Sequence, residues 1–101
     1  MRVAISGFDW DEGNRAKCQK HGVSTAEIEA LFARPLAIRP DDAHSIVERR
    51  FLAVGKGKAG RSIFLAFTLR ERDGRIYVRP ITARYMHKKE VRRYEKENPE
   101  I

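Results

Sequence analysis

Hydrophobic residues at helical spacing mark one helix in the first third of the chain. Ser24-Thr25-Ala26-Glu27 is a capping box, in which the first and last side chains satisfy each other's free backbone N–H groups. Ile28, Leu31 and Phe32 then recur on one side of a helix. This pattern predicts a helix that ends before Pro35 and turns its apolar stripe toward the core.

Weaker signals precede this helix. Val3 to Ser6 is expected to form a short strand, and Asp11 is placed to cap a first helix that runs to about Lys20. Gly22 follows at the place where a left-handed residue commonly closes a helix. Trp10, beside the cap, is expected to pack onto the core, although a tryptophan here could also stack on a base.

From residue 48 onward the apolar pattern becomes that of β-strands. Three strands are expected, at Glu48–Gly55, Ser62–Arg70 and Arg75–Arg84. The second strand is apolar on both faces and should therefore lie centrally in the sheet. Asp73-Gly74 predicts a tight hairpin turn, and Pro80 predicts a bulge or an edge in the third strand.

The remaining segments connect or follow these elements. Pro40-Asp41-Asp42 is expected to turn, and Lys56–Gly60 to form a flexible hairpin loop. A basic helix should run from about His87 to Glu97, where Asn98-Pro99 stops it. The 101 residues therefore predict a single α+β domain over residues 1–101, with two N-terminal helices, an antiparallel sheet of three to five strands and a basic C-terminal helix.

Charge is concentrated in the second half of the chain. The net charge is +7, with −2 over residues 1–48 and +9 over residues 49–101. Because the basic residues lie within expected strands and a helix rather than in a tail, this asymmetry favours a polyanionic partner over a merely solvated surface. No N-terminal apolar run is long enough for a signal peptide or a membrane span, so a cytoplasmic protein is expected.

Metal and cofactor signals are weak. Cys18 is the only cysteine, which excludes an intramolecular disulfide. Cys18 and His21 could form half of a metal site, but a small helical residue and a helix-end imidazole explain them better. No metal and no cofactor are therefore expected.

Arginines on the expected sheet are the best candidates for phosphate binding, because a guanidinium stays charged and donates two parallel hydrogen bonds to a phosphate. Strand side chains alternate between faces. Thr82 and Arg84 therefore share a face with Arg79 only if a bulge near Pro80 shifts the register by one residue. The arginines concerned are Arg50, Arg70, Arg79 and Arg84.

RNA offers a cleavage reaction that requires no metal. Its 2′-hydroxyl attacks the neighbouring phosphate and leaves a cyclic phosphate and a free 5′-hydroxyl. This reaction needs positioning of the strand, proton transfer and positive charge around the phosphate. Candidate acid–base groups are His21, Glu48, Tyr85 and His87. The simpler interpretations are a helix C-terminal cap for His21 and an exposed surface residue for His87.

Several short motifs, taken in order, resemble the BrnT family of bacterial toxins. They are Trp10-Asp11, Lys20-His21-Gly22-Val23-Ser24, Glu48 with Arg50-Phe51 before Val54-Gly55, Phe67-Thr68 with Arg70, and Arg79-Pro80-Ile81-Thr82-Ala83-Arg84. The resemblance covers about residues 8–95. Each motif is weak alone, but their order and spacing are specific together.

The resemblance implies a RelE-like ribonuclease toxin that cleaves mRNA without metal and stalls translation. It also implies neutralisation by a BrnA-like antitoxin, through which alone the toxin would contact operator DNA. Carried over to the matching positions, Arg50, Arg79 and Arg84 are candidates for phosphate binding and transition-state stabilisation. His21 and Glu48 are the corresponding acid–base candidates. Further candidates for RNA contact are Trp10, Lys20, Thr68, Arg70, Thr82, Lys88 and Lys89.

Two other functions stay open at this stage. One is a nucleic-acid-binding regulator without catalysis, although no helix-turn-helix signature supports it. The other is an inactive scaffold whose basic face holds an acidic partner. Strongly salt-dependent DNA binding by the isolated chain would favour the first, and tight partner binding without RNA turnover would favour the second.

Overall fold

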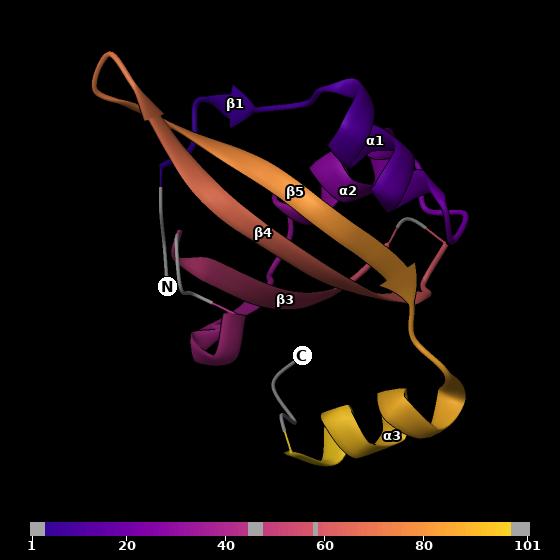
Figure 1. Ribbon diagram of the computed structural model, residues 1–101. Helices are drawn as coiled ribbons and strands as arrows, with labels where there is room; N and C mark the ends of the chain where they lie inside the picture. Colours follow the sequence, from indigo (N-terminus) through magenta and orange to yellow (C-terminus); the bar gives the residue numbers. More distant parts are fainter. Residues whose placement is uncertain (1–3, 45–47, 58, 98–101) are drawn as a thin grey trace.

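A five-stranded sheet organises the computed structural model, which describes residues 4–44, 48–57 and 59–97. Its order is β1-β5-β4-β3-β2 (Figure 1). The strands are β1 (Gly7–Phe8), β2 (Ala37–Pro40), β3 (Arg50–Lys56), β4 (Ser62–Arg72) and β5 (Arg75–Tyr85). The helices are α1 (Glu12–Gln19), α2 (Thr25–Leu31) and α3 (Lys88–Glu97), with a 3-10 turn, η1, at Asp42–His44. The predicted α+β class is confirmed.

The two N-terminal helices begin where the sequence predicts their caps. The Asp11 carboxylate accepts the backbone N–H of Asn14, and the Asn14 side chain accepts that of Asp11. Ser24 and Glu27 make the same reciprocal pair at the start of α2. Gly22, between the helices, adopts a left-handed backbone with φ of 86°. Local capping therefore explains both helix starts.

Helices α1 and α2 cover one face of the sheet (Figure 1), and the core lies between them and the sheet. Ile28 and Leu31 are buried, and Phe32 packs edge-on against Phe8 and Phe67 with ring centroids 5.4 Å apart. The apolar stripe predicted for this helix is thus part of the core, as expected.

The two edges of the sheet differ from the sequence prediction. Ala4 to Ser6 is not a strand, and Val3 lies outside the described residues. The first strand is instead the pair Gly7–Phe8, which runs parallel to β5 and so makes the sheet mixed. Ile5 and Phe8 both pack against the core. Strand β2 was not predicted, because four residues that end in a proline resemble a turn.

Other strand and helix boundaries differ from the predicted ones by one or two residues. Strand β3 begins at Arg50, so Glu48 precedes it. Strand β4 is central in the sheet as predicted, and Asp73 and Gly74 adopt positive φ angles in the hairpin turn that follows it. The predicted stop at Asn98-Pro99 lies outside the described residues.

The predicted bulge in β5 is confirmed. The pairing of β4 with β5 skips Ile81, so the alternation of side chains shifts by one residue there. Arg79, Thr82 and Arg84 consequently lie on the same face of the sheet. Pro80 points to the opposite face and is fully buried.

Helix α3 lies on the side of the sheet opposite α1 and α2 (Figure 1). None of its described residues is buried. A groove of about 560 Å³ separates it from β2, β3 and β4. Helix α3 therefore covers part of this face without forming a second core with it.

Candidate active site

The sheet face opposite α1 and α2 collects the predicted arginines. They come from β3, β4 and β5, and the strand register places them on one side. We call this surface the arginine face; it consists of Arg50, Thr68, Arg70, Tyr77, Arg79, Thr82 and Arg84.

Three of these residues, Arg50, Thr68 and Arg79, form a row across the central strands, which we call the arginine row. Arg50 pairs with Thr68 between β3 and β4, and Thr68 pairs with Arg79 between β4 and β5. Since neighbouring strands lie about 4.8 Å apart, the two arginine backbones are roughly 10 Å apart. Thr68 is 4% exposed, and its hydroxyl has no hydrogen-bond partner within the described part of the chain. Such a group calls for an explanation, and a bound ligand oxygen is one.

Each arginine of this face is paired with a carboxylate. These ion pairs are partly exposed to solvent, where such pairs contribute at most about 1 kcal/mol. A phosphate, which also accepts two hydrogen bonds from a guanidinium, can therefore replace the carboxylate at modest cost. The pairs are Arg50–Asp41 (3.4 Å), Arg70–Glu48 (3.0 Å), Arg79–Asp11 (2.7 Å) and Arg84–Glu90 (2.8 Å).

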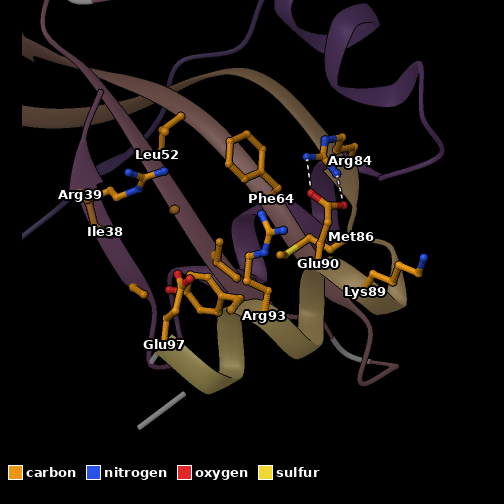
Figure 2. Close-up of a pocket in the computed structure, with 14 residues that line it drawn as sticks. Ile38, Arg39, Leu52, Phe64, Arg84, Met86, Lys89, Glu90, Arg93 and Glu97 are labelled. Carbon is orange, nitrogen blue, oxygen red and sulfur yellow. Dashed lines mark hydrogen bonds and ion pairs between the residues drawn. The ribbon is translucent and has the colours of Figure 1, made fainter. Parts of the chain in front are cut away.

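The Arg84–Glu90 pair joins the sheet to α3. Two guanidinium nitrogens of Arg84 donate to the two carboxylate oxygens of Glu90, both at 2.8 Å (Figure 2). These hydrogen bonds lower the pKa of Glu90 to about 2 and raise the pKa of Arg84. The guanidinium carbon also lies 5.0 Å from the ring centroid of Phe64. Arg84 is thus held in one orientation at the mouth of the groove.

The groove beneath α3 combines an apolar floor with a cationic rim. Figure 2 shows Leu52 and Phe64 on the sheet side and Met86 at the start of the helical segment. Its volume lies in the range of sites that bind small molecules or nucleotides. The basic residues that line it are Arg39, Arg84, Lys89 and Arg93.

Of the predicted acid–base groups, exposed His87 donates its backbone N–H to Glu90, the partner of Arg84, and Glu48 lies beside Arg70. Glu48 precedes β3, accepts one hydrogen bond from Arg70 at 3.4 Å and forms an ion pair with it at 3.0 Å. Lys20 and His21 are exposed in the turn between α1 and α2, on the opposite side of the sheet. The structure therefore does not bring His21 to the arginine row.

Trp10 and Tyr85 also belong to the helix-covered side. Trp10 packs half-buried against the core, and its indole N–H donates to Glu29 at 2.9 Å. The Tyr85 hydroxyl donates to Glu27 at 2.6 Å, which raises the pKa of Tyr85 and lowers that of Glu27. Tyr85 is consequently held in its protonated form, away from the arginine face.

The lysines predicted to contact RNA lie at the start of α3. Lys88 and Lys89 are exposed, and Lys89 lines the groove. Thr82 lies on the arginine face, half-buried, in the interval between the arginine row and Arg84. Lys89 and Arg84 thus line the same groove.

One side-chain pair near the row was not singled out from the sequence. The Nδ1 atom of His44 lies 2.9 Å from Oδ2 of Asp41, which is 9% exposed. The available signal was the spacing of an aspartate and a histidine three residues apart, but the turn predicted at Pro40-Asp41-Asp42 does not include His44. Recognising the pair required the unpredicted strand β2, which places Asp41 beside Arg50.

No three His, Cys, Asp or Glu side chains within the described ranges lie together as a metal-binding group. No helix there is long and apolar enough to cross a membrane.

Fold and surface together define an α+β domain with a guanidinium-rich sheet face suited to phosphate groups. The chain belongs to the BrnT family, the ribonuclease toxins of type II toxin–antitoxin systems, whose family model matches residues 10–90. This match confirms the resemblance seen in the sequence motifs. A search of curated proteins finds no match. Membership of the family implies an RNA substrate and an antitoxin partner.

Proposed function

We propose that this protein is a metal-independent endoribonuclease that cleaves RNA by attack of the 2′-hydroxyl on the adjacent phosphate. The observation that carries the proposal is the row of Arg50, Thr68 and Arg79 on the open side of the sheet. A rigid sheet holds these donors in place before the substrate arrives, which is the condition for electrostatic catalysis.

In this proposal the scissile phosphate lies between Arg50 and Arg79, and the Thr68 hydroxyl donates to a non-bridging oxygen. The 2′-oxygen forms a bond to phosphorus, and the bond from phosphorus to the 5′-oxygen breaks. The phosphate gains negative charge on the way, and the two guanidinium groups stabilise that charge without a metal.

Arg84 binds another phosphate of the same strand. It lies opposite Phe64, four residues along β4 from Thr68, or roughly 13 Å at 3.3 Å per residue. The phosphate takes the place of Glu90 on the guanidinium. Lys89, which lines the groove, and the neighbouring exposed Lys88 continue the cationic path. Arg70 and Glu48 flank the row on its other side and complete the contact surface.

The partner proposed for neutralisation is a DNA-binding antitoxin of the BrnA type. The family description supports an antitoxin of a type II system. The strong positive charge of residues 49–101 supports an acidic contact region on that antitoxin. Under this proposal the toxin acts on mRNA in the cytoplasm, with or without the ribosome, and reaches operator DNA through the antitoxin.

The proposal predicts RNA cleavage that survives EDTA and depends on Arg84. The chain, freed of any antitoxin, is incubated with end-labelled RNA in EDTA, beside DNA of matching sequence. RNA alone should be cut. Arg50→Ala should lower the rate by at least ~10²-fold, since it removes charge stabilisation at the scissile phosphate. Arg84→Ala should lower the rate at subsaturating RNA by a similar factor, since it removes the contact that positions the strand through a second phosphate. Gln19→Ala, at an exposed position of α1, serves as the control that should cut at the normal rate.

An unchanged rate in either arginine variant would remove that residue from the site. If free RNA is not cut, the assay is repeated with translating ribosomes. Absence of cleavage in both settings would contradict the proposed function and favour a binding protein without catalysis.

A further inference from the structure

The arginine row continues onto the neighbouring edge strand. Pro40 pairs with Phe51, and the backbone N–H of the next residue, Asp41, donates to the carbonyl of Arg50 at 2.8 Å. Residues directly opposite each other in paired strands share a face. Asp41, Arg50, Thr68 and Arg79 therefore form one transverse row, which we call the polar row.

Asp41 holds an imidazole at the end of this row. Its Oδ2 atom lies 2.9 Å from His44 Nδ1 and 3.4 Å from Arg50 Nε. The 3-10 turn η1 fixes the spacing, since the backbone N–H of His44 donates to the Asp41 carbonyl at 3.2 Å. The Asp41 side chain is 11% exposed and the His44 side chain 65% exposed. One carboxylate thus fixes both a guanidinium and an accessible imidazole.

The contact also determines which imidazole nitrogen can accept a proton. A carboxylate accepts hydrogen bonds, so the neutral ring carries its proton on Nδ1 and its lone pair on Nε2. The same arrangement, a buried carboxylate that orients a histidine base, serves proton transfer in hydrolases of unrelated folds.

We propose that His44 is the general base of the RNA cleavage, with Asp41 as its positioning residue. This inference rests on the proposed ribonuclease function. His44 Nε2 takes the proton of the 2′-hydroxyl as the 2′-oxygen attacks phosphorus. The phosphorus–5′-oxygen bond breaks, and the 5′-oxygen takes a proton from solvent water. The products are a 2′,3′-cyclic phosphate and a 5′-hydroxyl, and His44 returns its proton to solvent.

Glu48 is the weaker candidate for this role. Its carboxylate already accepts a hydrogen bond from Arg70 and is ion-paired with it, so its oxygens are directed at a guanidinium rather than at a 2′-hydroxyl. A histidine titrates near neutrality and so both accepts and releases a proton at working pH.

The test measures single-turnover RNA cleavage by wild type, His44→Ala and Asp41→Asn. The His44→Ala rate at pH 7 should fall ~10²–10⁴-fold, the usual contribution of a general base, while RNA affinity changes little. Added imidazole should restore part of the lost rate, which a structural defect would not permit. The wild-type rate should rise with pH through the histidine range, and this rise should be absent in His44→Ala. Asp41→Asn should also lower the rate, because Asp41 is the carboxylate that contacts the imidazole and orients it.

His44→Gln keeps a polar side chain at this exposed position. It should unfold with the wild-type free energy and still lose the activity, which excludes misfolding as the cause. Wild-type cleavage with an equal rate in His44→Ala overturns the assignment of His44 and leaves the proposed ribonuclease intact. Absence of wild-type cleavage, on free RNA and on ribosomes, overturns both.

Discussion

The buried hydroxyl of Thr68 lowers the stability of the fold and, in the proposed site, binds the phosphate. This hydroxyl is buried between two arginine positions and has no hydrogen-bond partner within the described ranges. A buried hydroxyl left unpaired costs stability. In the proposed site the hydroxyl has a function, because it gains a charged hydrogen-bond acceptor when a phosphate is bound.

Thr68→Val should therefore separate stability from activity. Valine has nearly the same shape without the hydroxyl, so the free energy of unfolding should stay equal or rise by about 1 kcal/mol. Cleavage should fall at least about tenfold, since a hydrogen bond to a charged group is worth ~1.5 kcal/mol or more. Urea unfolding and the RNA cleavage rate are the two measurements.

Thr68→Ser is the matched control, because it retains the hydroxyl and should retain most of the activity. A Thr68→Val protein that is markedly less stable, or that cleaves at the wild-type rate, would contradict this role for the hydroxyl.

At the scale of elements, the bulge at Pro80 determines which residues share the site. Without it, Thr82 and Arg84 would face the helices rather than the arginine face. Asn14 of α1 anchors this bulge: its side-chain amide donates to the carbonyl of Pro80 at 2.9 Å and to that of Asp9 at 2.9 Å. Asn14 is 6% exposed, so no solvent replaces these bonds when they are lost.

Asn14→Ala should lower the free energy of unfolding by about 2–4 kcal/mol, because three hydrogen bonds are lost and a buried carbonyl is left unpaired. The third bond is the one that Asn14 accepts from the backbone of Asp11 at 2.7 Å. Gln19→Ala, exposed on the same helix, should change it by no more than about 0.5 kcal/mol. Equal stability of the two variants in denaturant unfolding would show that the anchor is unimportant.

The sequence predicts elements better than it predicts their alignment. The caps at Asp11 and Ser24, the central strand and the Pro80 bulge all follow from local patterns, and the structure has them. The polar row requires the register of four strands, and a one-residue shift would move each side chain to the other face. Asp41 and His44 were missed for this reason, since they join the row only through strand β2.

At the scale of the whole molecule, a charged contact joins α3 to the sheet. None of the described residues of α3 is buried. Glu90 accepts both guanidinium bonds of Arg84 and the backbone N–H of His87 at 2.9 Å. These contacts lower the pKa of Glu90 from its ordinary 4.5 to about 2. This contact therefore depends on the Glu90 charge.

The pH dependence follows from the direction of this shift. A carboxyl group whose pKa falls on folding stabilises the fold above its ordinary pKa and loses that contribution as pH falls toward the folded value. The stability difference between wild type and Glu90→Gln should be constant from pH 8 to about pH 5, and it should shrink between pH 4.5 and about 2. Thermal unfolding of both proteins across this range measures it. A difference that does not change with pH would contradict the ion pair.

The most direct test of the central claim is the chemistry of the RNA ends after cleavage in EDTA. Attack by the 2′-hydroxyl on a phosphate held by the arginine face predicts 2′,3′-cyclic phosphate and 5′-hydroxyl ends, and no cleavage at a position where the 2′-hydroxyl is replaced by hydrogen. Fragments with 5′-phosphate ends, or cleavage that requires added metal, would contradict the account.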